Sequence, residues 1–151
     1  MEHSKYFYHE DEIASWRTFS GIPEIFEKDK GRFKVLCTDD TKDLWFGVYE
    51  LDPGDEHWVH RHDDVSELYY IMKGKALVRV DDETRECTAG TGIYMPVGSW
   101  HGIKNTGDEV LTLVWAYNRP RGYGSAFVWE DPELQAIWER QQTSGSKLKG
   151  Q

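Results

Sequence analysis

The chain has 151 residues, with 27 acidic and 18 basic side chains and a formal net charge of -9. That length suits one domain with its own core, and the negative charge without a basic cluster argues against nucleic-acid partners. No stretch approaches the roughly 20 apolar residues of a membrane span. The N-terminal residues also lack the apolar segment of a secretion signal, so we expect a soluble cytoplasmic protein without a membrane partner.

The first 30 residues scatter aromatic side chains among charges without sustained periodicity. Such a segment cannot form a core alone, so it is predicted to be an N-terminal arm that packs across the domain or on a partner subunit. Alternation of apolar and polar residues then predicts strands. The predicted strands cover residues 32–37, 44–51, 67–72, 75–80 and 110–117.

A helix is predicted over residues 131–140, with Asp131 as N-cap and Pro132 at the first helical position. Its apolar residues at helical spacing are Leu134, Ile137 and Trp138. The helix is expected on the exterior of the domain or on a neighbouring subunit. Residues 143–151, rich in Ser, Gly and Lys, are expected to be disordered.

The two cysteines and two of the arginines give little indication of function. Cys37 and Cys87 are far apart and form no closely spaced pair, so we expect reduced thiols. Arg119 and Arg121 leave the last predicted strand, and we interpret them as surface residues rather than as a clamp for a substrate carboxylate.

His60 and His62 are two residues apart in a stretch that follows the turn at Gly54. On an extended strand both side chains leave the same face, with Cα atoms roughly 7 Å apart. Both imidazoles can then bind one ion, with each nitrogen about 2.1 Å from the metal. A lone pair of this kind can also lie on a half-exposed strand at little cost, so further ligands are needed to indicate a site.

Two more side chains supply such ligands. Asp63 and Asp64 signal a turn, and the following strand can return Glu67 to the side of the two histidines. His101 follows a tight loop with Pro96 and Gly98 that re-enters the sheet. Three imidazoles and one carboxylate suit a divalent first-row metal such as Fe, Mn, Co, Ni, Cu or Zn.

Regular alternation places Glu56 and Trp58 on the face of the two histidines, and His57 on the opposite face as a surface or interface residue. Tyr69 shares the face of Glu67. Trp58 and Tyr69 are therefore candidate substrate-pocket residues, with core packing as the alternative for Trp58. The phenol of Tyr69 can donate or release a proton, so Tyr69 and Glu67 are the candidate catalytic residues.

The two histidine-containing segments resemble both signature motifs of the cupin superfamily, with no position missing. The spacings are Gly54-x5-His60-x-His62-x4-Glu67-x6-Gly74 and Gly90-x5-Pro96-x-Gly98-x2-His101-x3-Asn105. The resemblance implies an all-β, single-domain antiparallel β-barrel, or jelly roll, over residues 1–151. Its parts would be an arm (1–30), the barrel (31–118), a C-terminal extension with the helix (119–142) and a tail (143–151). It also implies His60, His62, Glu67 and His101 as ligands of one divalent transition metal per chain.

Cupins include dioxygenases, lyases, isomerases and non-enzymatic binding proteins, so the resemblance implies no single reaction. We favour a metal-dependent, oxygen-consuming dioxygenase that acts on a small organic acid or carbonyl compound. The alternatives are a non-redox lyase or isomerase, such as a dimethylsulfoniopropionate lyase, and a binding module without turnover.

The arm and the helix resemble elements through which cupins dimerise, so a homodimer is expected.

Overall fold

A computed structural model of the chain describes residues 6–13, 15–36, 41–119 and 127–144. The strands are β1 (Arg32–Val35), β2 (Trp45–Leu51), β3 (Glu56–His62), β4 (Glu67–Lys73), β5 (Lys75–Val80), β6 (Glu83–Thr88), β7 (Gly92–Met95), β8 (His101–Asn105), β9 (Leu111–Tyr117) and β10 (Phe127–Trp129). The helices are α1 (Pro23–Phe26), α2 (Pro132–Thr143) and a 3-10 turn at Glu10–Glu12.

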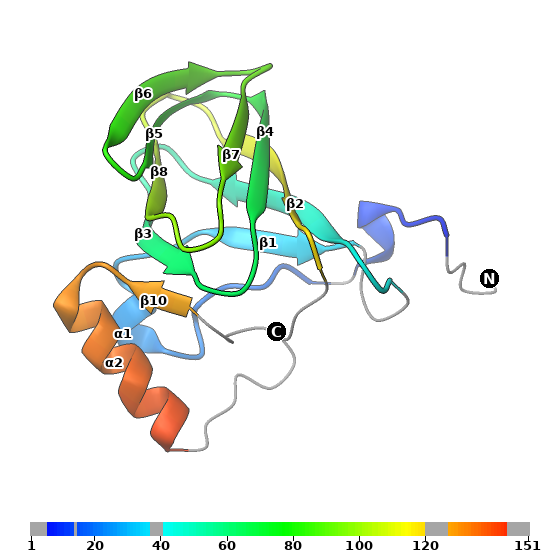
Figure 1. The fold of residues 1–151 in the computed structure, drawn as a ribbon. Helices are drawn as coiled ribbons and strands as arrows, with labels where there is room; N and C mark the ends of the chain where they lie inside the picture. The colour runs from blue at the N-terminus through cyan, green and yellow to red at the C-terminus, as the bar shows by residue number, and fades with distance from the viewer. Residues whose placement is uncertain (1–5, 14, 37–40, 120–126, 145–151) are drawn as a thin grey trace.

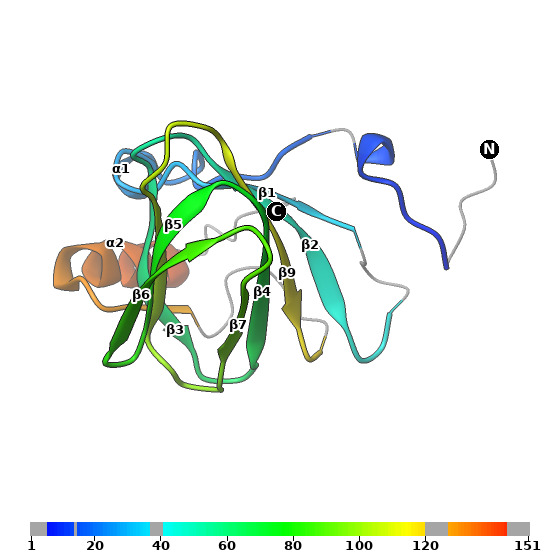
Figure 2. The ribbon, with the colours of Figure 1, turned by 90° about the horizontal axis from the view of Figure 1, so that it is seen from above.

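The strands of the described part form two antiparallel sheets that face each other (Figures 1 and 2). One sheet has the order β1-β2-β9-β4-β7, and we call it the β4 sheet. The other has the order β10-β3-β8-β5-β6, and we call it the β3 sheet. The chain changes sheet at every connection between successive strands except β1–β2 and β5–β6. This arrangement confirms the predicted all-β jelly roll with a C-terminal helix.

The main core lies between the two sheets. In β4, the odd-numbered residues from Glu67 to Ile71 are buried and the even-numbered ones are exposed, as a strand with one buried face requires. Ile71, Leu111 and Leu113 have no exposed surface at all. Burial of such side chains contributes about 1.5–3 kcal/mol each, so the two sheets are held together mainly by apolar packing.

A second apolar cluster joins the two ends of the chain beside the β3 sheet. Its buried members are Phe19, Ile22, Ile25, Trp129, Leu134, Ile137 and Trp138. Within it α1 and α2 lie side by side (Figure 1). The later part of the N-terminal segment therefore packs on its own chain, whereas residues 6–13 project away from the sheets.

Helix α2 begins where the sequence predicts. Oδ1 of Asp131 accepts hydrogen bonds from the N–H groups of Glu133 and Leu134 at 3.0 and 2.9 Å. The helix continues to Thr143, beyond the predicted end. Its apolar side chains are buried in the second cluster, so the helix covers the exterior of its own domain.

Several sequence expectations concern positions outside the main elements. Cys87 is a free thiol and buried, and Arg119 is exposed. Cys37, Arg121 and residues 145–151 lie outside the described residues. None of the helices in the described ranges is both long enough and apolar enough to cross a membrane.

Candidate metal centre

A β-bulge in β3 determines which side chains face the interior. His57 pairs with Ile103 of β8 and His60 pairs with His101, so β3 advances by three residues where β8 advances by two. The extra residue resets the alternation of the strand. As a result His57, His60 and His62 are all buried, with 7%, 1% and 2% of their surface exposed.

Two expectations assumed regular alternation along β3 and are wrong because of the bulge. Trp58 does not share the inner face of the histidines, because its Nε1 donates to the carbonyl of Lys28 at 3.1 Å and its ring packs on the second apolar cluster. His57, expected at the surface, takes the inner position. Gly102 leaves room for the bulge, since a Cβ there would lie 2.9 Å from Cγ2 of Val59.

The other two predicted ligands are the first residues of their strands. Glu67 opens β4, between β7 and β9. His101 opens β8 directly opposite His60. The loop before His101 is tied to β3 because the N–H of Gly98 donates to the carbonyl of His62 at 2.8 Å. Gly98 has a φ of 79°, a conformation that glycine adopts without steric cost.

The structure brings the four predicted ligands together. One donor atom from each of His60, His62, Glu67 and His101 lies within 4.8 Å of the others, and all four residues are buried. Oε2 of Glu67 is 2.9 Å from Nε2 of His101 and 3.4 Å from Nε2 of His62. We call these four residues the metal group. Three imidazoles and a carboxylate at this spacing have the donor chemistry of a first-row metal site.

The backbone orients two of the imidazoles. Nδ1 of His60 is 2.7 Å from the carbonyl oxygen of Trp58, and Nδ1 of His101 is 3.0 Å from that of Ser99. Because a carbonyl oxygen only accepts, each Nδ1 donates, and Nε2 is the ring atom left to bind an ion. Nε2 of His60 is buried and has no hydrogen-bond partner within the described ranges. A bound cation would satisfy this atom.

The electrostatics of the group also suit a cation. Burial favours the neutral form of Glu67, but hydrogen bonds from His101 and His62 outweigh it and lower the pKa of Glu67 to about 2. Burial, with the neighbouring His57, His101 and His62, lowers the pKa of His60 well below its usual value. A carboxylate and a neutral imidazole are the forms that ligate metals. The metal group therefore fits a divalent ion.

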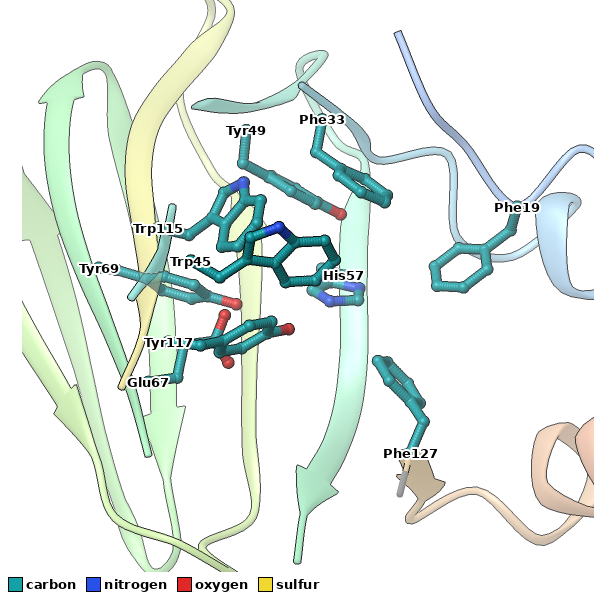
Figure 3. A pocket seen from close by; sticks show the side chains of 10 residues that line it. All are labelled: Phe19, Phe33, Trp45, Tyr49, His57, Glu67, Tyr69, Trp115, Tyr117 and Phe127. Carbon is teal, nitrogen blue, oxygen red and sulfur yellow. The ribbon is translucent and has the colours of Figure 1, made fainter. Parts of the chain in front are cut away.

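A cavity of ≈ 50 Å³ lies between the sheets beside Glu67. Its walls are mostly aromatic (Figure 3). The lining residues are Phe19, Phe33, Trp45, Tyr49, His57, Glu67, Tyr69, Trp115, Tyr117 and Phe127. No lysine or arginine occurs among these described residues, so the cavity suits a small compound that is apolar apart from the end facing the metal group.

Tyr69 lines this cavity, whereas Trp58 does not. The Tyr69 side chain is only 3% exposed, and burial together with the charge of Glu67 raises its pKa well above the usual value. At neutral pH the phenol is therefore a hydrogen-bond donor. Its part in catalysis stays a prediction.

Sequence reasoning missed a buried pair at the cavity wall. Nδ1 of His57 lies 2.6 Å from Oδ2 of Asp29, and Asp29 has no exposed surface. It also missed Tyr117, whose hydroxyl is 3.4 Å from Nε2 of His62. Tyr117 could have been found, because it alternates with Trp115 on a predicted strand. The position of His57 had no local signal, since it depends on the bulge.

Known proteins resemble the chain in both sequence and fold. Residues 47–117 match the sequence profile of the family described as Cupin domain. An uncharacterised protein of Methanocaldococcus jannaschii is 34% identical over 61 residues, which are 40% of this chain and 49% of that protein. A 5-nitrosalicylic acid 1,2-dioxygenase of a Bradyrhizobium species is 29% identical over 110 residues, 72% of this chain and 53% of that protein. The chain thus spans about half the length of these two relatives.

A solved structure gives the same fold. The crystal structure of an RmlC-like cupin from Shewanella frigidimarina superposes with a TM-score of 0.62 and 21% identity, over 80% of this chain and 96% of that one. Two facing antiparallel sheets with three histidines and a glutamate between them define the class of jelly-roll proteins with an internal metal site. The motifs, the fold and the match of residues 47–117 to the Cupin domain profile make this part of the chain similar to the cupin superfamily.

Proposed function

We propose that the protein is a metal-dependent dioxygenase that acts on a small organic acid or carbonyl compound. The observation that carries this proposal is the buried metal group of His60, His62, Glu67 and His101 beside an aromatic cavity. A divalent metal held there would supply Lewis acidity and, as Fe(II), activation of O2. The dioxygenase relative supports the reaction class, since its similarity extends over 72% of this chain.

Each residue of the site would have its own role in binding the ion or the substrate. His60 and His101 bind the ion through Nε2, because each Nδ1 is already engaged by a backbone carbonyl. Glu67 supplies the negative charge. The hydroxyl of Tyr69, two residues further on the same face of β4, lies beside Glu67 at the cavity and would donate to a substrate oxygen once Glu67 is bound to the ion.

The cavity walls limit the substrate. The volume of ≈ 50 Å³ compares with about 10–15 Å³ for a single water-sized group, so a compound of a few non-hydrogen atoms fits. Aromatic rings on most sides exclude water from the reacting atoms. Among the described lining residues, the polar groups away from the metal group are the tyrosine hydroxyls, the indole N–H groups of Trp45 and Trp115, and the imidazole of His57, which Asp29 holds in place.

The first experiment measures transition metals in untagged protein purified without added metal. We expect about one ion per chain in the native protein and a near-complete loss in His101→Ala, because the site then lacks one of four donors. His9→Ala is the matched control, since the His9 side chain is 67% exposed. Equal metal content in the native and His101→Ala proteins would contradict the ligand set.

Oxygen uptake then tests the reaction class. Metal-loaded protein is supplied with small organic acids and diketones, and dissolved oxygen is followed together with product. Oxygen consumed in proportion to product supports the dioxygenase. Product without oxygen consumption would indicate a lyase or isomerase instead, and binding without product would indicate a module that only binds its ligand.

A further inference from the structure

The hydroxyl of Tyr117 lies at the edge of the metal group. Its oxygen is 3.4 Å from Nε2 of His62, and Oε2 of Glu67 is also 3.4 Å from that nitrogen. Donor atoms bound to one ion at about 2.1 Å lie about 3.0 Å apart in octahedral geometry and about 3.4 Å apart in tetrahedral geometry. The Tyr117 oxygen therefore lies at the spacing from His62 that two ligands of one ion have.

The register of the sheet places this hydroxyl beside Glu67. Tyr117 ends β9 and pairs directly with Glu67 of β4, so both side chains point to the same face of the β4 sheet. Figure 3 shows the Tyr117 ring next to the Glu67 carboxylate. The ring packs against those of Trp45 and Trp115, with centroids 5.9 and 5.2 Å away. This packing holds the ring in place independently of its hydroxyl.

The other two tyrosines of the cavity direct their hydroxyls elsewhere. The hydroxyl of Tyr69 hydrogen-bonds to Glu67, so it contacts a residue that would itself bind the ion. The hydroxyl of Tyr49 lies against Gly31, where an added Cβ would collide with it. Tyr117 instead directs its hydroxyl at an imidazole of the metal group.

The charges of the metal group favour one more anionic donor. Three neutral imidazoles and the Glu67 carboxylate supply one negative charge, whereas a divalent ion brings two positive charges. Asp29, the other buried carboxylate in the described part of the chain, is bonded to His57 at 2.6 Å and stays outside the group. An uncompensated charge between the sheets is costly. A tyrosine oxygen without its proton would balance the remaining positive charge.

We propose that Tyr117 is a fifth donor to the ion held by the metal group, through its hydroxyl oxygen. The proposal rests on the metal site of the proposed function and adds a ligand to it. As the oxygen binds, its O–H bond breaks and the proton leaves to solvent. Five donors from the chain leave one position of an octahedral ion for an outside atom. The substrate would therefore bind the ion through a single atom and not as a chelate.

Absorption spectroscopy of the ferric protein tests the proposal. Metal-free protein is loaded with Fe(III), and iron per chain is measured in the same samples. We expect a visible charge-transfer band from the tyrosine oxygen to iron in the native protein, and its complete loss in Tyr117→Phe at equal iron content. Tyr69→Phe is the matched control, because it removes a hydroxyl from the same cavity and should keep the band. Circular dichroism confirms the fold of each variant.

The dissociation constant for Zn²⁺, obtained by competition with a chelator, is a second measure. Tyr117→Phe should raise this constant about 10-fold or more, as expected when a group that supports a metal site is removed. Tyr94→Phe is the control and should leave the constant unchanged. Its ring is 65% exposed on β7 and lies outside the cavity. An unchanged constant in Tyr117→Phe would contradict the fifth donor.

A third measurement uses the native protein and so does not depend on any variant folding. Resonance Raman spectra excited in the visible band should show ring vibrations that shift when the protein is produced with ring-deuterated tyrosine. A native protein with about one iron per chain and no such band overturns the proposal and leaves the four-residue metal group intact. A band that survives in Tyr117→Phe, or is lost equally in Tyr69→Phe, also overturns it. A native protein that binds neither iron nor zinc overturns the metal site itself, and the proposal with it.

Discussion

Asp29 has no exposed surface, and its hydrogen bonds go to the chain around the cavity. Oδ1 accepts from the N–H of Gly31 at 3.2 Å, and Oδ2 accepts from the N–H of Trp58 at 3.1 Å. Burial alone would lower the pKa of His57, but the charge and hydrogen bond of Asp29 raise it overall. The Asp29 carboxylate thus holds both the His57 ring and the backbone of Trp58, next to the bulge.

We expect Asp29→Asn to lower the free energy of unfolding by about 1–3 kcal/mol. An amide has one acceptor atom where the carboxylate has two, so at least one of the N–H groups now bonded to Asp29 loses its acceptor. Urea unfolding measures the change. Asp82→Asn, at the exposed β5–β6 turn, is the control, and an Asp29→Asn protein as stable as this control would refute the role of the network. Metal content should be unchanged, because Asp29 is outside the metal group.

At the scale of elements, α2 depends on its first turn. Asp131 accepts two of the N–H groups that a helix leaves unpaired at its start. Asp131→Ala should therefore lower the free energy of unfolding by about 1 kcal/mol, and Asp131→Asn, which keeps a capping oxygen, should lose much less. Urea unfolding of the three proteins measures both changes. Equal stability of the Ala and Asn variants would show that the cap contributes nothing beyond the packing of α2.

The elements with strong local patterns could be predicted from the sequence. Strands β2, β4, β5 and β9 follow alternation and differ from the predicted ranges by at most one residue at an end. Helix α1 and strand β10 could not be predicted, because four and three residues are too few to show a period. They exist because tertiary packing holds them: Ile25 of α1 and Trp129 of β10 meet in the second apolar cluster.

The ligands of the site could be predicted, but most of its walls could not. His60, His62, Glu67 and His101 have ligand chemistry at a recognisable spacing, and the fold brings them together. The inward position of His57 follows from the pairing of β3 with β8, a contact between distant segments that alternation within β3 does not encode. The lining residues Phe19 and Phe127 come from the two ends of the chain, so only the folded structure brings them to the cavity (Figure 3).

At the scale of the whole molecule, the metal group connects the two sheets. Its three histidines lie on β3 and β8 of the β3 sheet, whereas Glu67 lies on β4 of the other sheet. A metal bound by all four residues would add a link across the core. An ion that binds the native state and not the unfolded chain stabilises the fold by mass action.

Removal of the metal should therefore lower the thermal midpoint of the whole domain. An ion present at about 100 times its dissociation constant stabilises by about 2.7 kcal/mol. For a domain of this size each kcal/mol shifts the midpoint by about 2–4 °C, so chelation should lower it by about 5–10 °C. Scanning calorimetry of native, chelated and metal-reloaded protein measures the shift. His101→Ala, left with three donors, should have nearly the same midpoint with and without chelator. A native protein that loses its metal without a change in midpoint would show that the metal group does not hold the two sheets together.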